Sequence, residues 1–403
     1  MIKKVFGAAL CAALLFGSAA CGESGASSDS IQLTVWSSSE DQATSDSWLP
    51  VMEKAFEKAH PEYKITWKNS VVAEADASKT VKQDPSAAAD VYMFANDQLG
   101  SLVSSDAIGE LSDEATKQLK EQNDESMIES ITGTDGKYYG MPFSGNTWFM
   151  YYNKSKFSDE DVKSLDTMLE KGKVAFSISN AWYLPAFYVG AGATIFGENG
   201  LDAKSGVKLG DNATAVTKYL ANMVNNSNFV LDDNGSGLAG LQNGTVDAYF
   251  SGTWEANDAK KALGDNYGAA QLPTFTTDAG TFQMKAFSGS KAIAYNPTSK
   301  NAEVASKVAA FLASTEAQKK HYELRATVPT DRSLADLVKN DPAAKAQMDT
   351  IANTSILQST LTQMNDFWDP TQTFGAELAN KEINADNAAA KTEAFAKQLA
   401  GIK

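Results

Sequence analysis

The segment Ile31-Gln32-Leu33-Thr34-Val35-Trp36 opens the pattern that decides the fold class of this 403-residue chain. Apolar and polar residues alternate along it, as in a half-buried strand. Apolar residues then recur at three- and four-residue spacing over 48–59, which predicts a helix. Further strands are predicted at 63–67 and 90–94. This strand–helix–strand order favours an α/β fold with a mostly parallel sheet covered by helices.

The same alternation continues past the length of an ordinary single domain. The sequence predicts strands at 148–153, 246–250 and 283–295 and helices at 159–173 and 304–312. The chain after residue 334 is predicted to be mostly helical. At about 100–200 residues per domain, two domains are expected and three are possible.

The composition excludes a disordered or fibrous chain and argues against a nucleic-acid-binding protein. Hydrophobic residues make up 43% of the chain, as in an ordinary globular protein. There are 35 Lys and Arg against 50 Asp and Glu, which gives a formal net charge of −15. Such an acidic chain is not expected to bind the phosphate backbone of nucleic acids.

The N-terminus reads as an export signal. Two lysines within residues 1–4 precede the apolar stretch 5–17, which is too short to span a bilayer at about 20 residues per crossing. The following Ser18-Ala19-Ala20-Cys21 resembles a bacterial lipobox, although Ser18 departs from the usual aliphatic residue. The alternative is an ordinary secretory signal with a chance cysteine.

The lipobox reading predicts a lipid-anchored protein. We expect residues 1–20 to be a signal peptide, Cys21 to carry the lipid, and 21–30 to form a flexible tether of small polar residues. Cys11 also lies in the signal, so the folded body has no cysteine for a disulfide or a metal site.

Motifs for catalysis are scarce. The two histidines, His60 and His321, lie in helical patterns without obvious partners, and nucleotide-binding, zinc-protease and serine-hydrolase motifs are absent from the sequence. We therefore predict no cofactor, no metal and no catalytic residues. The many carboxylates leave an exported glycoside hydrolase open as an alternative of another class.

Aromatic residues give the strongest indication of a binding site. Trp182, Trp254 and Trp368 lie beside turn or small polar residues, whereas Trp36, Trp48 and Trp67 lie within strand or helix patterns and are expected in the core. Aromatic planes bind the apolar faces of sugars, and carboxylates or amides bind the hydroxyl rim. Burying one indole face, on the order of 100 Å², gives roughly 2–3 kcal/mol, more than one hydrogen bond to a hydroxyl.

The end of the strand at 90–94 is a second indication. Phe94 ends this strand, and Asp97 follows it in a loop, where ligands of α/β sheets usually bind. Asp97 is alternatively a helix N-cap.

Six segments of the chain form a further pattern, namely 33–36, 89–100, 135–142, 151–154, 244–254 and 363–368. In their order and spacing, over nearly the whole chain after the signal, they resemble the maltose-binding type of solute-binding protein from bacterial carbohydrate ABC transporters.

The resemblance implies a set of sugar contacts. It places Glu40 and Asp41 at polar contacts, Phe94 at a stacking position and Asp97 at the carboxylate that binds hydroxyls. Asn146 stands where the family usually has Glu, and Asp41 where it often has Lys. The resemblance also implies aromatic contacts, namely Trp182, Tyr183, Trp254 and Trp368.

The resemblance also implies the architecture and the function. We expect a two-lobe periplasmic-binding-protein-like fold with a hinge and an interlobe cleft, lobe 1 comprising 31–144 and 286–328 and lobe 2 comprising 145–285 and 329–403. We expect the protein to be a monomeric lipoprotein on the outer face of the cell membrane. We do not expect it to be an enzyme. It would deliver malto-oligosaccharides or related gluco-oligosaccharides to an ABC permease. Another oligosaccharide or a polyamine-like solute is the alternative within binding proteins.

Overall fold

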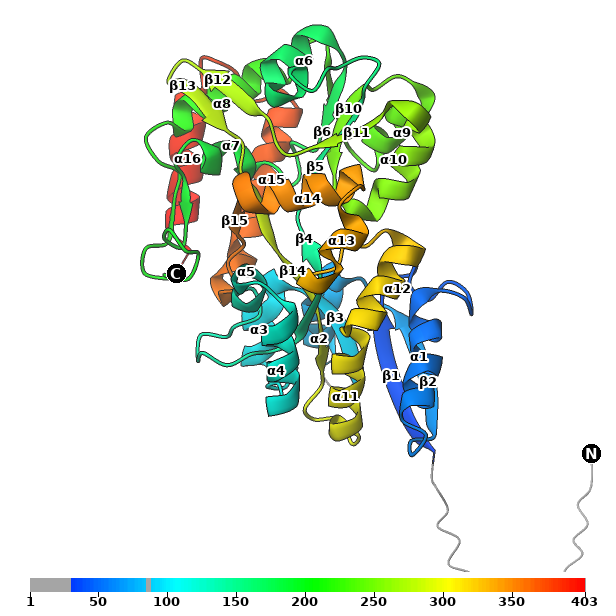
Figure 1. Ribbon diagram of the computed structural model, residues 1–403. Coiled ribbons are helices and arrows are strands. Elements are labelled where there is room, and N and C mark those ends of the chain that lie inside the picture. Colours follow the sequence, from blue (N-terminus) through cyan, green and yellow to red (C-terminus); the bar gives the residue numbers. More distant parts are fainter. Residues whose placement is uncertain (1–29, 85–87, 403) are drawn as a thin grey trace, which may run out of the picture.

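Two sheet-centred lobes, one above the other, make up the computed structural model, which describes residues 30–84 and 88–402 (Figure 1). Lobe 1 is built on a six-stranded sheet in the order β15-β14-β3-β1-β2, with β4 paired to β14. Lobe 2 is built on a five-stranded sheet in the order β11-β5-β10-β6-β9. The predicted two-lobe α/β architecture is confirmed.

The first strand–helix–strand unit forms as its pattern predicts. Strand β1 (Ile31–Ser37) pairs in parallel with β2 (Ile65–Val71) and with β3 (Val91–Ala95), and α1 (Trp48–Ala59) connects the first two. All five residues of β3 are buried, as expected for a strand covered on both faces.

The prediction of a mostly parallel sheet is wrong for the strands that cross between lobes. Strand β14 (Ala286–Tyr295) returns from lobe 2 and pairs antiparallel with β3 and β4 (Met141–Asn146), while β15 (Ser355–Leu357) lies parallel to β14. The sheet of lobe 2 also mixes both directions. Its strands are β5 (Phe149–Asn153), β6 (Val174–Phe176), β9 (Phe229–Leu231), β10 (Ala248–Ser251) and β11 (Tyr267–Ala270).

Helices cover both sheets (Figure 1). Those near the sheet of lobe 1 are α2 (Ala77–Gln83), α3 (Leu99–Ser104), α4 (Asp113–Gln122), α5 (Glu125–Glu129), α11 (Ala302–Leu312) and α12 (Thr315–Arg325). Those near the sheet of lobe 2 are α6 (Leu165–Lys171), α7 (Pro185–Gly190), α8 (Ala213–Met223), α9 (Ser236–Asn243), α10 (Ala256–Leu263), α14 (Pro342–Asn353), α15 (Asn365–Ala379) and α16 (Ala388–Ala400).

Short elements complete the chain. Helix α13 (Ala335–Val338) precedes α14, and two hairpins pair β7 (Thr194–Ile195) with β8 (Val207–Lys208) and β12 (Thr274–Thr277) with β13 (Gly280–Gln283). The predicted helical character after residue 334 is confirmed, apart from β15. None of the helices within 30–84 and 88–402 combines the length and hydropathy that a membrane crossing requires.

Each lobe has its own apolar core. Trp48 and Phe56 lie in the core of lobe 1, and Trp148 and Phe187 in that of lobe 2. The predicted burial of Trp36 and Trp48 is confirmed, while Trp67 is half-buried. The exact lobe boundaries predicted from the sequence stay predictions, as do the signal peptide at 1–20 and the anchor at Cys21, which lie outside the described residues.

Candidate functional site

A cavity of about 420 Å³ lies between the lobes, where strands of both sheets end. Lobe 1 contributes residues at or just after β2, β3 and β4, and lobe 2 contributes loops that follow β6 and β10, together with α15. Its polar and aromatic lining consists of Glu74, Asp97, Asn146, Asn180, Trp182, Trp254, Lys291, Gln358, Trp368 and Gln372.

The lobe 1 wall carries the charges of the cavity. Asp97 lies in a single turn of 3-10 helix directly after β3, and burial raises the pKa of its carboxyl to about 7. Glu74 follows β2 in another such turn, and its Oε2 lies 3.5 Å from Nζ of Lys291 on β14. The carboxylates accept hydrogen bonds and the ammonium group donates them, so this wall suits a ligand rich in hydroxyls.

The lobe 2 wall carries three indoles. The rings of Trp182 and Trp254 lie 6.0 Å apart at an angle of 36°. Trp368 is held edge-to-face against Phe287 and Phe367, with ring centroids at 6.0 and 5.4 Å. Trp254 remains 39% exposed, which is high for so large an apolar side chain. These half-open aromatic planes suit the apolar faces of a ligand.

The side-chain amide of Gln358 in lobe 1 contacts the Trp182 indole of lobe 2. Nε1 of Trp182 donates a hydrogen bond to Oε1 of Gln358 at 2.7 Å, and Nδ2 of Asn96 donates to the backbone oxygen of Gln358 at 3.2 Å. Gln358 itself follows β15 of lobe 1 and is buried. The orientation of the Trp182 indole is therefore fixed from the opposite lobe.

An acidic recess of about 360 Å³ adjoins the cavity and shares Asn180, Trp254 and Gln372 with it. Asp232 and Glu255 line this recess. Burial, together with the nearby charge of Asp232, raises the pKa of Glu255. The recess therefore extends the polar surface beside the indole of Trp254.

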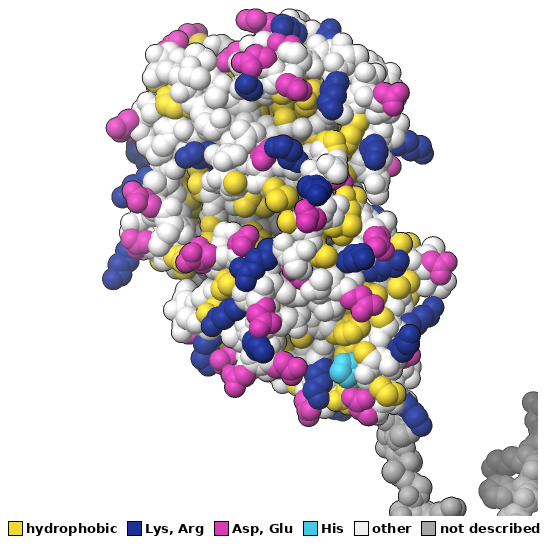
Figure 2. All heavy atoms as spheres, viewed as in Figure 1, with side chains coloured by type: hydrophobic (Ala, Val, Ile, Leu, Met, Phe, Trp, Pro, Cys, Tyr) yellow, Lys and Arg dark blue, Asp and Glu magenta, His cyan; other side chains and the backbone are white. Residues whose placement is uncertain are grey.

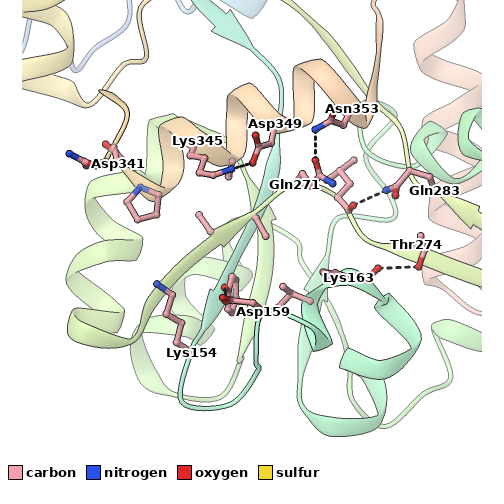
Figure 3. Close-up of a pocket in the computed structure, with 18 of the residues that line it drawn as sticks. Lys154, Asp159, Lys163, Gln271, Thr274, Gln283, Asp341, Lys345, Asp349 and Asn353 are labelled. Carbon is pink, nitrogen blue, oxygen red and sulfur yellow. Dashed lines mark hydrogen bonds and ion pairs between the residues drawn. The ribbon is translucent and has the colours of Figure 1, made fainter. Parts of the chain in front are cut away.

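A larger hollow of about 830 Å³ lies elsewhere on lobe 2, between α14 and β11 (Figure 3). No tryptophan is among the described residues that line it. Several of its polar side chains pair with one another: Lys345 with Asp349, and Nδ2 of Asn353 with Oε1 of Gln271 at 3.0 Å. We therefore place the candidate site in the smaller cavity, where aromatic planes and hydrogen-bonding groups converge.

The face drawn in Figure 2 shows no large patch of a single charge among the described residues. Acidic and basic side chains are interspersed on the face drawn in Figure 2, and apolar side chains gather near its middle. Within the described part of the chain, no three His, Cys, Asp or Glu side chains come together as a metal site would require.

The structure brings five of the nine predicted ligand-binding residues to one cavity. These are Asp97, Asn146, Trp182, Trp254 and Trp368. Their contact with a ligand stays a prediction.

The other four do not line the cavity. Phe94 is fully buried in the core of lobe 1, so the predicted stacking role does not fit it. Tyr183 is 8% exposed and stacks on Trp148, reaching only the acidic recess. Asp41 is buried in an ion pair with His321, and Glu40 is exposed on the loop after β1.

Sequence reasoning missed other lining residues. Glu74 and Gln372 lie in segments that no motif marked, and Gln358 lies in a crossing segment whose position depends on tertiary structure. Lys291 interrupts an otherwise uncharged strand, 286–295, and this lone charge was the available signal.

Known proteins resemble this chain over most of its length. The model of the family described as bacterial extracellular solute-binding protein matches residues 52–347. A maltooligosaccharide ABC transporter solute-binding lipoprotein of Streptococcus pneumoniae (strain ATCC BAA-255 / R6) is 29% identical over 366 residues, which cover 85% of this chain and 84% of that protein. A galactooligosaccharide-binding protein of Bacillus subtilis (strain 168) is 27% identical and covers 96% of both chains.

A solved structure of a protein with acarbose superposes with a TM-score of 0.89. Its sequence is 45% identical, and the match covers 92% of this chain and 99% of that one. The likeness therefore extends across both lobes and the cavity between them.

Proposed function

The chain belongs to the bacterial extracellular solute-binding proteins, the group that its motifs resemble, and from this premise we propose that it captures malto-oligosaccharides for an ABC permease. The observation that carries the proposal is the meeting of Trp182, Trp254 and Trp368 in one interlobe cavity with carboxylate and amide side chains. Aromatic planes take the apolar sugar faces and the polar groups take the hydroxyl rim. The relative named for maltooligosaccharides supports this class of ligand.

The proposed mechanism is closure of the two lobes on the sugar. A closed form gains contacts from both walls only when ligand is present, so ligand shifts the population toward it. The permease then receives the closed, loaded form. The binding step breaks no bond, in keeping with a family of substrate-binding proteins.

The anchoring and the assembly state are further parts of the proposal. We propose a monomer tethered to the outer face of the membrane by lipid on Cys21, a location supported by the relative named as a lipoprotein. Loss of fatty-acid incorporation in Cys21→Ser tests the anchor.

Galactooligosaccharides are the second candidate, because the relative named for them covers 96% of this chain. The names of these relatives favour oligosaccharides over a polyamine-like solute, and the family favours binding over glycoside hydrolysis.

Isothermal titration with maltotetraose, a galactooligosaccharide and spermidine tests the ligand class. We expect saturable binding of maltotetraose at micromolar concentrations or below. Thin-layer chromatography of the same mixtures should recover intact sugar. Cleavage products would overturn the transport function, and binding of spermidine alone would overturn the ligand class.

A further inference from the structure

Lys291 and Trp254 come from different lobes and meet across the cavity. Lys291 lies on β14, opposite Ala95 of β3, whereas Trp254 follows β10. Nζ of Lys291 lies over the indole of Trp254, 5.6 Å from the ring centroid. This distance is within the range in which a cation is attracted to an aromatic face. A charged group of lobe 1 thus rests on an aromatic plane of lobe 2.

Glu74 forms an ion pair with the same ammonium group. Its Oε2 lies 3.5 Å from Nζ of Lys291, and the two side chains are only 10% and 23% exposed. A pair this sheltered is screened less by salt than a pair on the open surface. Glu74 therefore favours a position of the ammonium group beside the cavity.

Lys291 is also the one cationic side chain among the described residues that line the cavity. An ammonium group has three donors and no acceptor. Glu74 can take only part of this donor capacity, so donors remain for oxygen atoms of a ligand. Because Nζ lies 5.6 Å from the centre of the Trp254 ring, these donors are close to any sugar unit that stacks on that indole.

We propose that Lys291 is a further ligand-binding residue: its ammonium group, oriented by Glu74, donates hydrogen bonds to the hydroxyl oxygens of the sugar unit that stacks on Trp254. The inference rests on the proposed function, because it names a contact for the same oligosaccharide. Before the sugar arrives, the ammonium group covers part of the indole. When the sugar arrives, the ammonium group moves from the ring face to the hydroxyl rim.

Titration of the full-length protein with maltotetraose tests the proposal. Lys291→Met keeps the length of the side chain but removes the donors, and we expect its affinity to fall at least tenfold, since hydrogen bonds to charged groups contribute that much. Lys291→Arg retains the donors and should bind within about threefold of wild type. Lys285→Met is the matched control, because Lys285 is also half-buried and just precedes β14 but does not line the cavity.

The possible results distinguish failure of the inference about Lys291 from failure of the proposed function. Failure of the wild type to bind maltotetraose overturns the proposed function. Wild-type binding with equal affinity in Lys291→Met overturns the inference alone. Tighter binding by Lys291→Met also overturns it, because that result is expected if the ammonium group only covers Trp254. Melting temperatures close to wild type show that each variant is folded.

Discussion

Nε2 of His321 lies 2.9 Å from Oδ1 of Asp41, and both residues are buried in lobe 1. The imidazole also stacks on Trp48, with ring centroids 4.2 Å apart, and Nε of Arg325 lies 3.4 Å from the same carboxylate oxygen. Burial by itself raises the pKa of Asp41, but the charge and hydrogen bond of His321, with the charge of Arg325, hold it below its usual value. Asp41 is therefore an anchor between the loop after β1 and helix α12.

Replacing Asp41 should lower the stability of the folded protein. We expect Asp41→Ala to lower the free energy of unfolding by about 3 kcal/mol, because removing one member of a buried pair leaves the other without compensation. Urea denaturation at pH 7 measures the effect. Asp46→Ala, an exposed residue of the same loop, is the control and should change stability little. A tenfold loss of sugar affinity in Asp41→Ala at unchanged stability would instead support the ligand contact predicted from the family resemblance.

Truncation of Phe94 and of Trp254 should distinguish a residue of the core from a residue of the binding site. Phe94→Ala empties a fully buried position and is expected to cost about 3–5 kcal/mol of stability. Trp254→Ala truncates a side chain that is 39% exposed, so it should cost little stability but lower maltotetraose affinity at least tenfold. Denaturation and titration of both variants measure the two effects. The opposite pattern would mean that the site lies elsewhere.

Phe94 and Trp254 show which parts of the site the sequence pattern can and cannot predict. All of β3 is buried, so its residues lack the alternation that tells which side chain faces a ligand and which faces the core. Trp254 follows the end of β10 beside Gly252, and a large aromatic residue at such a position was a usable signal. Lys291 carried a signal of its own, a charge within an uncharged strand, but its meeting with Trp254 depends on how the lobes face each other.

The fold, like the site, could be predicted only in part from the sequence. Local patterns predicted β1 from its alternation, α1 from its helical spacing and β3 from its continuous apolar run, because each pattern reflects the burial of the element itself. The direction of β14 does not follow from its own residues. It follows from the return of the chain from lobe 2, which makes β14 antiparallel to β3.

Asp97 should make stability depend on pH. Burial raises the pKa of its carboxyl from 3.8 to about 7, so between these values the folded state retains a proton that the unfolded state has lost. Its contribution to stability therefore falls as pH rises from about 4 to 7. We expect Asp97→Asn to match wild type near pH 4 and to melt at a higher temperature at pH 8. Equal melting temperatures at pH 8 would contradict the raised pKa of this carboxyl.

The same carboxyl should make binding depend on pH. A carboxylate accepts stronger hydrogen bonds from sugar hydroxyls than a neutral carboxyl does. We expect wild type to bind maltotetraose several-fold more tightly at pH 8 than at pH 6, and Asp97→Asn to show little change between the two. Titrations at both pH values measure this. An equal pH dependence in the variant would assign the effect to another group.

Gly252 should control the position of the indole that follows it. A Cβ atom at this residue would lie 2.0 Å from Cζ3 of Trp254. The backbone at Gly252 has φ −105°, which alanine adopts without strain, and the hydroxyl of Tyr151 donates a hydrogen bond to its carbonyl oxygen at 2.9 Å. Because the backbone is held, the ring must move.

We therefore expect Gly252→Ala to lower maltotetraose affinity about as much as Trp254→Ala, at least tenfold, with a melting temperature near that of wild type. The double variant should bind no more weakly than Trp254→Ala alone, since both changes remove the same stacking contact. Titration of the two single variants and the double variant with maltotetraose measures the affinities that this double-mutant cycle compares. Additive losses would show that Gly252 acts on the ligand by a route other than the indole, and an unchanged affinity in Gly252→Ala would show that the ring position seen here is not the one that binds sugar.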